Sequence, residues 1–537
     1  ALAGEHRLGA ELARIAPDVV STAPPLAGSD SAEDRFRQFD AVARLLREVC
    51  LQAPLLVVLD DAHWADEASL LLLHHVTRVL TDERLLLVVN ARDTERHDAL
   101  VARIGREPVT RRIQLRGLAP AAIRRQLASV LGRQVDEREV LETEALTDGN
   151  PFFVGEVALA IADRRQERYS PLATKNVQDA IATRLRRLSP DCVRMLEAAA
   201  IVGRDFSIAV VAAMLDRPVA GCLALVDEAR AARLVEADGE PDGYRFVHAL
   251  VRDAIEQALG TADRVRLHRS AADAIEQHHR APSGPHVFEL ARHWAVAAVV
   301  GERARAAGWI RRAAEEAMRR LAYEEAARLF RQTLDIGGPE LDGEERCALL
   351  LAAGTAAHLS ADLDGRLDAC LEAAEVARAL DRPDLLAEAA LVMEPVGRPG
   401  FDLATRRLCE GAIAALGPQP VRLRARVTAR LAESFAYLRE LDRARPASEQ
   451  ALALAEQSGD SAAVAAALRA RQLVYSGPDG LDDRAQLAHR MLALGRQTRQ
   501  ADVEVWARLW RIDASFERGD LGRVASEIDA LARCVRE

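Results

Sequence analysis

The sequence predicts a mainly α-helical protein with an α/β part near its N-terminal end. Ala, Leu, Arg and Glu dominate the 537 residues and aromatic residues make up only 4%, a composition that favours packed helices over β-sandwiches and barrels. Amphipathic helical patterns fill residues 262–537. Two short, wholly apolar runs typical of strands, Leu55–Leu59 and Leu85–Val89, interrupt the helical pattern near the N-terminal end.

Residues 1–165 should form the α/β part. Helical patterns in residues 1–50 are interrupted by a Ser/Pro/Gly-rich stretch at residues 21–31. A helix over Ala65–Leu80 then separates the two apolar runs, and a strand–helix–strand order with runs apolar on both faces predicts two buried parallel strands. A third, shorter strand is predicted at Arg112–Leu115, followed by helices at Ala119–Leu131 and Glu137–Thr147.

Residues 166–262 and 263–537 have two different helical patterns. In the first, three helices precede two short strands near Arg233–Glu236 and Tyr244–Val247, as in a winged-helix domain. In the second, similar segments begin 42, 40, 38, 40 and 40 residues apart, and a period near 40 with two helices per unit predicts a helical solenoid. These segments begin at Leu321, Leu363, Leu403, Leu441, Leu481 and Leu521.

Charge and cysteine content narrow the class of protein. The net charge of −10 gives no general attraction to nucleic acid. Seven scattered cysteines without a Cys-x-x-Cys pair indicate reduced thiols, and no apolar run approaches the ~20 residues of a membrane helix. We therefore expect a cytoplasmic protein without a membrane span. Because the first residue is Ala1 and the first methionine is Met195, we also expect the chain to be a fragment.

Two adjacent carboxylates, Asp60 and Asp61, follow the first apolar run. Ligands of open α/β sheets bind where the carboxyl ends of the strands meet. In phosphoryl transfer one carboxylate holds Mg²⁺ and the next orients or deprotonates the attacking water. The alternative is that Asp60 or Asp61 only caps the following helix.

The segment around these acids, LLVVLDDAHWADEASLLLLHHV, resembles the Walker B segment of STAND-type ATPases, specifically the large ATP-binding LuxR-family transcriptional regulators and their AAA-like relatives. Three further motifs of that family follow in the family's order: VVNARDTE, TDGNPFFVGEV and YRFVHALVRDAI. The resemblance implies a truncated P-loop NTPase (AAA-like) domain with lid helices at 1–165, a winged helix at 166–262 and a TPR-like α-solenoid at 263–537.

The resemblance also implies a role for particular residues in binding ATP or ADP with Mg²⁺. Asp60 would coordinate Mg²⁺ and Asp61 would activate water. Arg92 would sense the γ-phosphate and His248 would contact the diphosphate of ADP. Pro151 would pack on adenine, with the turn of Gly149 and Asn150 shaping the approach. Local alternatives remain open: Arg92 as a surface arginine, Asn150 and Pro151 as an ordinary helix start, and His248 as a structural histidine.

Two parts of the family pattern are missing. The P-loop, G-x-x-x-x-G-K-[ST], does not occur, and the single lysine, Lys175, lies far beyond Asp61. We expect the P-loop upstream of Ala1, so that this chain alone is an inactive ATPase. A DNA-reading helix-turn-helix is also missing, and DNA would be reached only through such a domain after Glu537.

The resemblance implies a nucleotide-dependent switch in a bacterial LuxR-type regulator. ADP would hold the winged helix closed, and an inducer, a small molecule or protein on the concave face of the repeats, would favour an open, self-associating ATP form. Two alternatives stay open. The chain could be a non-hydrolysing helical-repeat scaffold, or the sensor region of a STAND protein fused to a cyclase or kinase.

Overall fold

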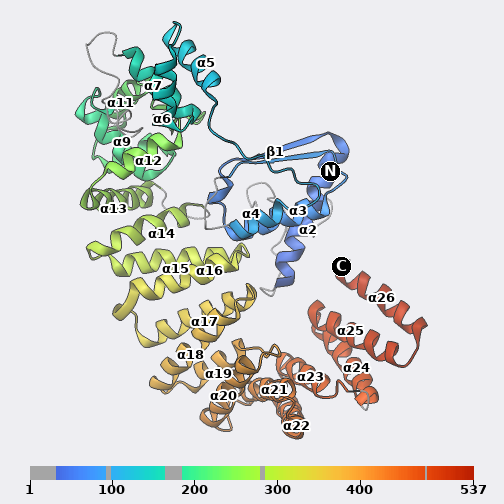
Figure 1. Ribbon diagram of the computed structural model, residues 1–537. Helices are drawn as coiled ribbons and strands as arrows, with labels where there is room; N and C mark the ends of the chain where they lie inside the picture. The colour runs from blue at the N-terminus through green and yellow to red at the C-terminus, as the bar shows by residue number, and fades with distance from the viewer. Residues whose placement is uncertain (1–31, 92–97, 164–183, 279–284, 478–479, 537) are drawn as a thin grey trace. The chain divides into compact units, whose positions relative to one another are not determined.

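The computed structural model describes residues 32–91, 98–163, 184–278, 285–477 and 480–536 (Figure 1). Its described part is mainly helical with a small sheet near the N-terminal end, as predicted. The Ser/Pro/Gly-rich stretch at residues 21–31, Arg92 and Lys175 lie outside the described residues. The chain divides into two compact units whose main parts are residues 70–313 and 314–537.

The predicted strand–helix–strand unit is present. Strands β1 (Leu55–Leu59) and β2 (Leu85–Val89) pair in parallel, with Leu55 opposite Leu85 and Leu59 opposite Val89. Three helices of this region are α2 (Ala32–Gln52), α3 (Glu67–Val79) and α4 (Asp98–Ile104), and a short 3₁₀ turn, η2 (Ala62–Trp64), follows β1.

Two expectations about this sheet are wrong. We expected strands buried on both faces, but Leu56, Val58 and Leu86 are 60%, 56% and 60% exposed. The predicted strand at residues 112–115 is not formed, and Ile113 and Leu115 in it are 71% and 88% exposed. An apolar pattern records that a segment is suited to burial, but a strand also needs a neighbouring strand to pair with and a layer to cover it. In the described residues the sheet that contains β1 has only two strands.

The next three helices form a small core of their own. Helices α5 (Pro120–Leu131) and α6 (Glu137–Thr147) match the predicted ranges, and α7 (Pro151–Asp163) packs against α5. Helix α6 begins with a capping box, in which the Asp136 carboxylate accepts a hydrogen bond from the Glu139 N–H. The fully buried side chains of this core are Ile123, Leu127, Val140, Val154 and Ala158.

Residues 190–258 combine helices with a three-stranded sheet. The two predicted strands are present as β4 (Val235–Ala237) and β5 (Gly243–Phe246), which pair antiparallel. A strand that the pattern did not predict, β3 (Asp205–Ser207), pairs with the other edge of β5. This strand has only three residues, Asp-Phe-Ser, which are too few to show an alternation of apolar and polar side chains. The helices of this part are α9 (Pro190–Val202), α10 (Ile208–Met214), α11 (Val219–Ala231) and α12 (Ala249–Ala258).

From residue 261 onward the described structure is helical. Five of the six predicted repeat starts coincide with a helix start to within two residues, and the sixth, at Leu403, lies four residues inside α20. From α16 onward successive helices pack on each other, and α17, α19, α21 and α23 also pack in turn, so these four form one layer, which we call the inner layer. The helices are α13 (Thr261–His278), α14 (Pro285–Ala297), α15 (Arg303–Arg319), α16 (Tyr323–Gly337), α17 (Gly343–Leu359), α18 (Leu363–Ala379), α19 (Pro383–Val392), α20 (Pro399–Leu416), α21 (Val421–Tyr437), α22 (Leu441–Ser458), α23 (Ser461–Val474), α24 (Leu481–Thr498), α25 (Ala501–Glu517) and α26 (Leu521–Arg536), with 3₁₀ turns η5 (Ala298–Val300) and η6 (Gly338–Glu340).

Within the described residues, no single helix has both the length and the apolar character to cross a membrane. One pair, α10 and α11, meets the criterion only when the two helices, bent by 112°, are counted together.

Candidate functional site

The carboxyl ends of β1 and β2 bring Asp60 and Asn90 together. The Asn90 amide donates a hydrogen bond to the Asp60 carboxylate (3.3 Å), and the Asp61 N–H donates to the same oxygen (3.2 Å). The backbone fixes this arrangement, because the Asn90 N–H bonds Leu59 and the Asn90 carbonyl accepts from Ala62. Asp60 is exposed, as a carboxylate that meets a ligand at the edge of a parallel sheet must be.

Asp61 adopts a backbone conformation that is costly for a residue with a side chain. Its φ is 52°, in the left-handed region. Its carboxylate lies 3.5 Å from the Arg204 guanidinium, just before β3. Asp61 precedes η2 without a side-chain cap bond, whereas Asp66 caps α3 by accepting from the Ser69 N–H (2.7 Å). Capping of the long helix therefore does not explain why Asp60 and Asp61 are acidic.

The Gly149-Asn150-Pro151 turn is built by close backbone approach. Gly149 has a φ of +68°, and its carbonyl accepts a hydrogen bond from the Leu118 N–H (2.7 Å). A Cβ at this position would lie 2.6 Å from the Leu118 carbonyl oxygen. The Asn150 side chain accepts from the Phe152 N–H (3.0 Å), so it does cap α7, and Pro151 is the exposed first residue of that helix. The local alternative for this turn is thus correct in itself, and a role in nucleotide binding stays a prediction.

His248 lies at the start of α12 and contacts the same turn region. Its Nδ1 accepts a hydrogen bond from the Leu250 N–H (3.2 Å). Its ring stacks on Phe152, with ring centroids 4.1 Å apart. Because Phe152 follows Pro151, the structure brings two of the predicted site elements together through this aromatic pair. The role of His248 toward a diphosphate stays a prediction, as do those of Asp60 and Asp61.

A second contact joins α7 to the residues near β4. The Arg184 guanidinium forms an ion pair with Glu156 on α7 and also donates to the Ala232 carbonyl. The Glu156 side chain is only 8% exposed, and a buried carboxylate needs such a partner. Together with the His248–Phe152 stack, this ion pair fixes α7 against residues 184–258.

The residues at the sheet edge are suited to only part of a magnesium–nucleotide site. Asp60 offers one carboxylate, and among the described residues no group of three His, Cys, Asp or Glu side chains could hold a metal ion. Mg²⁺ commonly completes its shell with water and phosphate oxygens, so one carboxylate is sufficient when a nucleotide is bound. The backbone N–H groups and lysine of a P-loop are not provided by this sequence.

Sequence reasoning missed Asn90. It singled out Arg92, which lies outside the described residues, whereas Asn90 is the residue at the end of β2 that contacts Asp60. The signal was present, because an amide directly after an apolar strand lies at the same sheet edge as the acids that follow the neighbouring parallel strand.

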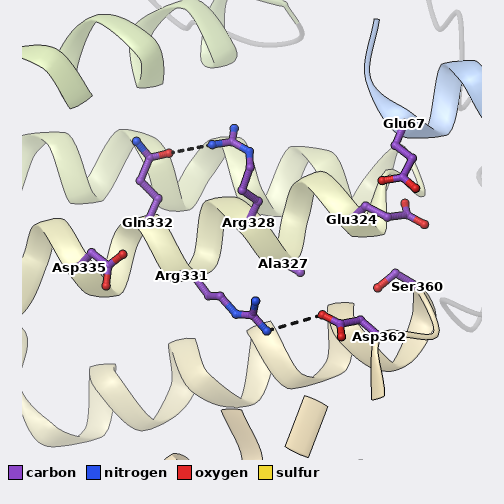
Figure 2. Close-up of a pocket in the computed structure, with 9 residues that line it drawn as sticks. All are labelled: Glu67, Glu324, Ala327, Arg328, Arg331, Gln332, Asp335, Ser360 and Asp362. Carbon is purple, nitrogen blue, oxygen red and sulfur yellow. Dashed lines mark hydrogen bonds and ion pairs between the residues drawn. The ribbon is translucent and has the colours of Figure 1, made fainter. Parts of the chain in front are cut away.

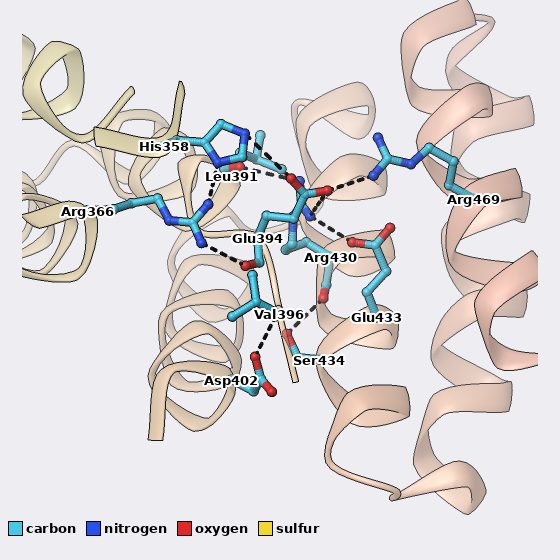
Figure 3. A network of polar contacts seen from close by, with 10 residues as sticks. All are labelled: His358, Arg366, Leu391, Glu394, Val396, Asp402, Arg430, Glu433, Ser434 and Arg469. Carbon is cyan, nitrogen blue, oxygen red and sulfur yellow. Dashed lines mark hydrogen bonds and ion pairs between the residues drawn. The ribbon is translucent and has the colours of Figure 1, made fainter. Parts of the chain in front are cut away.

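Sequence reasoning also missed a partly buried polar network in the repeats (Figure 3). The Glu394 carboxylate, in the linker between α19 and α20, lies 2.7 Å from Arg469 and 3.5 Å from Arg430. Arg430 also pairs with Glu433 (2.8 Å). Burial by itself would raise the pKa of Glu394, but Arg430 and Arg469 lower it to about 2. A periodic sequence pattern carries no signal for contacts between charged residues 36 to 75 positions apart.

Among the cavities of the described residues, two in the repeats are considered further. The larger, of about 590 Å³, is lined on the repeat helices by residues of α16 and of the turn between α17 and α18 (Figure 2). Its arginines have internal partners, Arg328 with Glu325 (2.5 Å) and Arg331 with Asp362 (3.7 Å). The second, of about 330 Å³, is lined by α19, α21, α23, α24, α25 and Gln500, beside the Glu394 network.

No protein-family model matches the chain. An uncharacterized protein of Rhizobium meliloti (strain 1021) is 26% identical over an alignment of 341 positions, and the alignment covers 60% of this chain and 32% of that protein. The chain thus spans about a third of the length of the curated relative that it matches.

Among solved structures, a STAND protein with a tetratricopeptide repeat sensor from Pyrococcus horikoshii gives a TM-score of 0.37 at 12% identity, covering 92% of this chain and 77% of that one. Aspartyl phosphate phosphatase F from Bacillus subtilis gives 0.32 at 10% identity, covering 79% and 96%. TM-scores this low transfer no function.

Proposed function

We propose that this chain is the switch and sensor region of a STAND-type ATPase of the LuxR-regulator kind, in which bound nucleotide controls how residues 184–258 pack on the nucleotide-binding part. The observation that carries the proposal is the stacking of His248 on Phe152, next to Pro151. It connects the motif that would hold adenine with the motif that would sense the diphosphate.

Each candidate residue has a defined task in this proposal. Asp60, oriented by the Asn90 amide, would hold Mg²⁺ through water, and Asp61 would activate the attacking water. Pro151 would pack on adenine and His248 would contact the diphosphate of ADP. Arg92 would sense the γ-phosphate. When bound, ATP or ADP with Mg²⁺ supplies the charge that distinguishes the closed state from the open state.

The phosphate cradle would come from a P-loop in a longer polypeptide that contains these residues. The exposed apolar residues of β1 and β2 support this arrangement, because a complete nucleotide-binding sheet would cover them. The repeats would bind an inducer, and the open form would self-associate and act through a DNA-reading domain in the cytoplasm.

Hydrolysis tests the proposal in the chain as it stands. Asp60 and Asp61 alone can neither position the β- and γ-phosphates nor stabilise their charge, so we expect negligible ATP turnover. ATP turnover at the rate of an ordinary P-loop enzyme, abolished by Asp61→Asn, would overturn the division of tasks between this chain and a separate P-loop. A longer polypeptide that contains a P-loop and still binds no nucleotide would favour the scaffold alternative instead.

A further inference from the structure

The second cavity in the repeats has the size and lining of a small-molecule site. Its volume of about 330 Å³ is at the lower end of the range for ligand pockets. We call it the Arg426 pocket. The residues that matter for its chemistry are Arg426, Arg430, Glu433, Arg469, Asp502 and Trp506.

One cation in the Arg426 pocket is left for a ligand. Arg430 is paired with Glu433 and Glu394, and Arg469 is paired with Glu394. Arg426 lies one turn before Arg430 on α21, is exposed, and has no ion-pair partner among the described residues. A guanidinium with free donors binds a carboxylate through two parallel hydrogen bonds.

A flat apolar surface lies beside these arginines. The Trp506 ring on α25 is 42% exposed, and the Arg469 guanidinium lies 5.8 Å from its ring centroid. Three alanines on α23 (Ala462, Ala465 and Ala466) line the same pocket with small side chains, and the buried side chains of Met491 and Val503 also line it. An exposed Trp in a pocket with small neighbours can stack on a flat ligand.

The negative groups of the pocket restrict the ligand to a single charge. The Glu433 carboxylate is already compensated by Arg430 (2.8 Å), whereas Asp502 has no ion-pair partner among the described residues. A second negative charge on the ligand would meet the uncompensated Asp502. The pocket is therefore unsuited to polyphosphates and nucleic acid.

Helix α19, which borders the pocket, is short. Helix α19 has 10 residues, whereas α17 and α21 on either side of it in the inner layer each have 17. The chain after α19 is extended, and Arg366 holds it by donating to the Glu394 carbonyl (3.1 Å). This interruption places the Glu394 carboxylate between Arg430 and Arg469 and so fixes both guanidinium groups (Figure 3).

From these observations we propose that the Arg426 pocket binds a small molecule with one carboxylate on a flat apolar body, the carboxylate on Arg426 and the flat body on Trp506. As the inducer site of the switch, this inference rests on the proposed function. Binding itself requires only the repeats and can be measured without nucleotide.

Three probes with the same ring separate the charge from the apolar body: phenylacetate, neutral phenylacetamide and cationic phenethylamine. Each probe is titrated into the 537-residue chain, and binding is followed by calorimetry and by tryptophan fluorescence. Comparison with Trp506→Phe shows which part of the fluorescence change comes from Trp506. We expect phenylacetate to bind about 10- to 100-fold more tightly than phenylacetamide, because only its carboxylate can accept a charge-assisted hydrogen bond from Arg426 in which both partners are ionised. Phenethylamine should bind most weakly.

The variants then assign the contacts. Arg426→Gln should remove the preference for phenylacetate, whereas Arg422→Gln, the matched control one turn away on α21 and outside the pocket, should retain it. Trp506→Leu should weaken phenylacetate and phenylacetamide alike. Equal affinity of the two probes, an unchanged preference in Arg426→Gln, or no saturable binding at about 10 mM phenylacetate would overturn the proposal.

The two proposals fail in different ways. If phenylacetate binds as expected but does not change nucleotide release from the longer polypeptide, the ligand site is supported and the proposed switch is contradicted. If nucleotide release responds to substitution of His248 while no probe binds, the switch stands and the pocket does not.

Discussion

At the scale of the residue, Gly149 shows how a motif is fixed by local sterics. Gly149→Ala would place a Cβ 2.6 Å from the Leu118 carbonyl oxygen in a backbone with φ of +68°. We expect a loss of about 2–4 kcal/mol in unfolding free energy, from the left-handed conformation and from overpacking. Urea unfolding, followed by circular dichroism, measures this loss of unfolding free energy.

Gly132 is the matched control. Its φ is +63°, but a Cβ there would meet nothing within 4 Å. Gly132→Ala should therefore cost only about 1 kcal/mol, the conformational part. Equal losses in the two variants would show that the close approach to Leu118 does not matter.

His248 should stabilise the fold as well as serve the proposed switch. His248→Ala removes both the cap on α12 and the stack on Phe152, at a cost of about 1–2 kcal/mol in unfolding free energy. His248→Asn keeps a capping oxygen and should restore about half of that loss. Thermal and urea unfolding compare the three proteins, and an alanine variant as stable as the wild type would contradict both contacts.

Part of the candidate site could be predicted residue by residue. The strand end pointed to Asp60 and Asp61, and local turn chemistry predicted Asn150 and Pro151 as a helix start, which the structure has. The roles of these four residues toward nucleotide stay predictions. The contacts of Asn90 with Asp60 and of Phe152 with His248 join residues 30 and 96 positions apart. No local pattern contains such pairings.

At the scale of the element, the exposure of one face of the β1–β2 sheet can be tested directly. Leu56→Thr, at a side chain that is 60% exposed, should change the unfolding free energy by less than about 0.5 kcal/mol. Leu70→Ala, at the 2% exposed leucine of α3, should cost about 2–5 kcal/mol. Comparable losses in both variants by urea unfolding would show that this face is covered.

Glu394, in the linker after α19, should make the stability of the repeats depend on pH in the acidic range. Burial opposes ionisation of Glu394, but Arg430 on α21 and Arg469 on α23, with His358 on α17, lower its pKa from 4.5 to about 2. A lowered pKa stabilises the fold above pH 4.5, and this contribution is lost as the pH falls from 4.5 towards 2.

Glu394→Gln measures this contribution. The variant should be less stable than the wild type at pH 7, and the difference should shrink between pH 4.5 and pH 2 in thermal unfolding followed by circular dichroism. Glu388→Gln, at an exposed position on α19, is the control for loss of a carboxylate on that helix. A difference between Glu394→Gln and wild type that does not change with pH would contradict the assignment.

Helical elements were predicted more accurately than strands. The repeat helices recur with a period that the amphipathic pattern records, so α18, α22, α24 and α26 begin at the predicted residues. Strand burial depends on neighbours elsewhere in the chain, which is why residues 112–115 were predicted as a strand and are not one. The short β3 needed its partner β5 to be recognised at all.

At the scale of the whole molecule, a two-stranded parallel sheet and helices α5–α7 come first, residues 184–258 follow and contact α7, and a series of repeat helices comes last. The sequence predicted this order of elements, whereas the nucleotide-binding, winged-helix and sensor roles of the parts stay predictions. No single part contains the proposed switch. A switch depends on the difference in free energy between the closed and the open state, and bound nucleotide changes that difference.

The most direct test of the proposed switch is the rate at which ADP leaves a polypeptide in which a P-loop is joined to these residues. If His248 contacts the diphosphate, His248→Ala should accelerate ADP release by about 10- to 150-fold, the effect of losing ~1.5–3 kcal/mol. Pro151→Ala should weaken ADP and ATP equally, because adenine packing does not distinguish the number of phosphates. Release of ADP at the wild-type rate from His248→Ala would contradict the central claim, and His248 would then be a structural residue only.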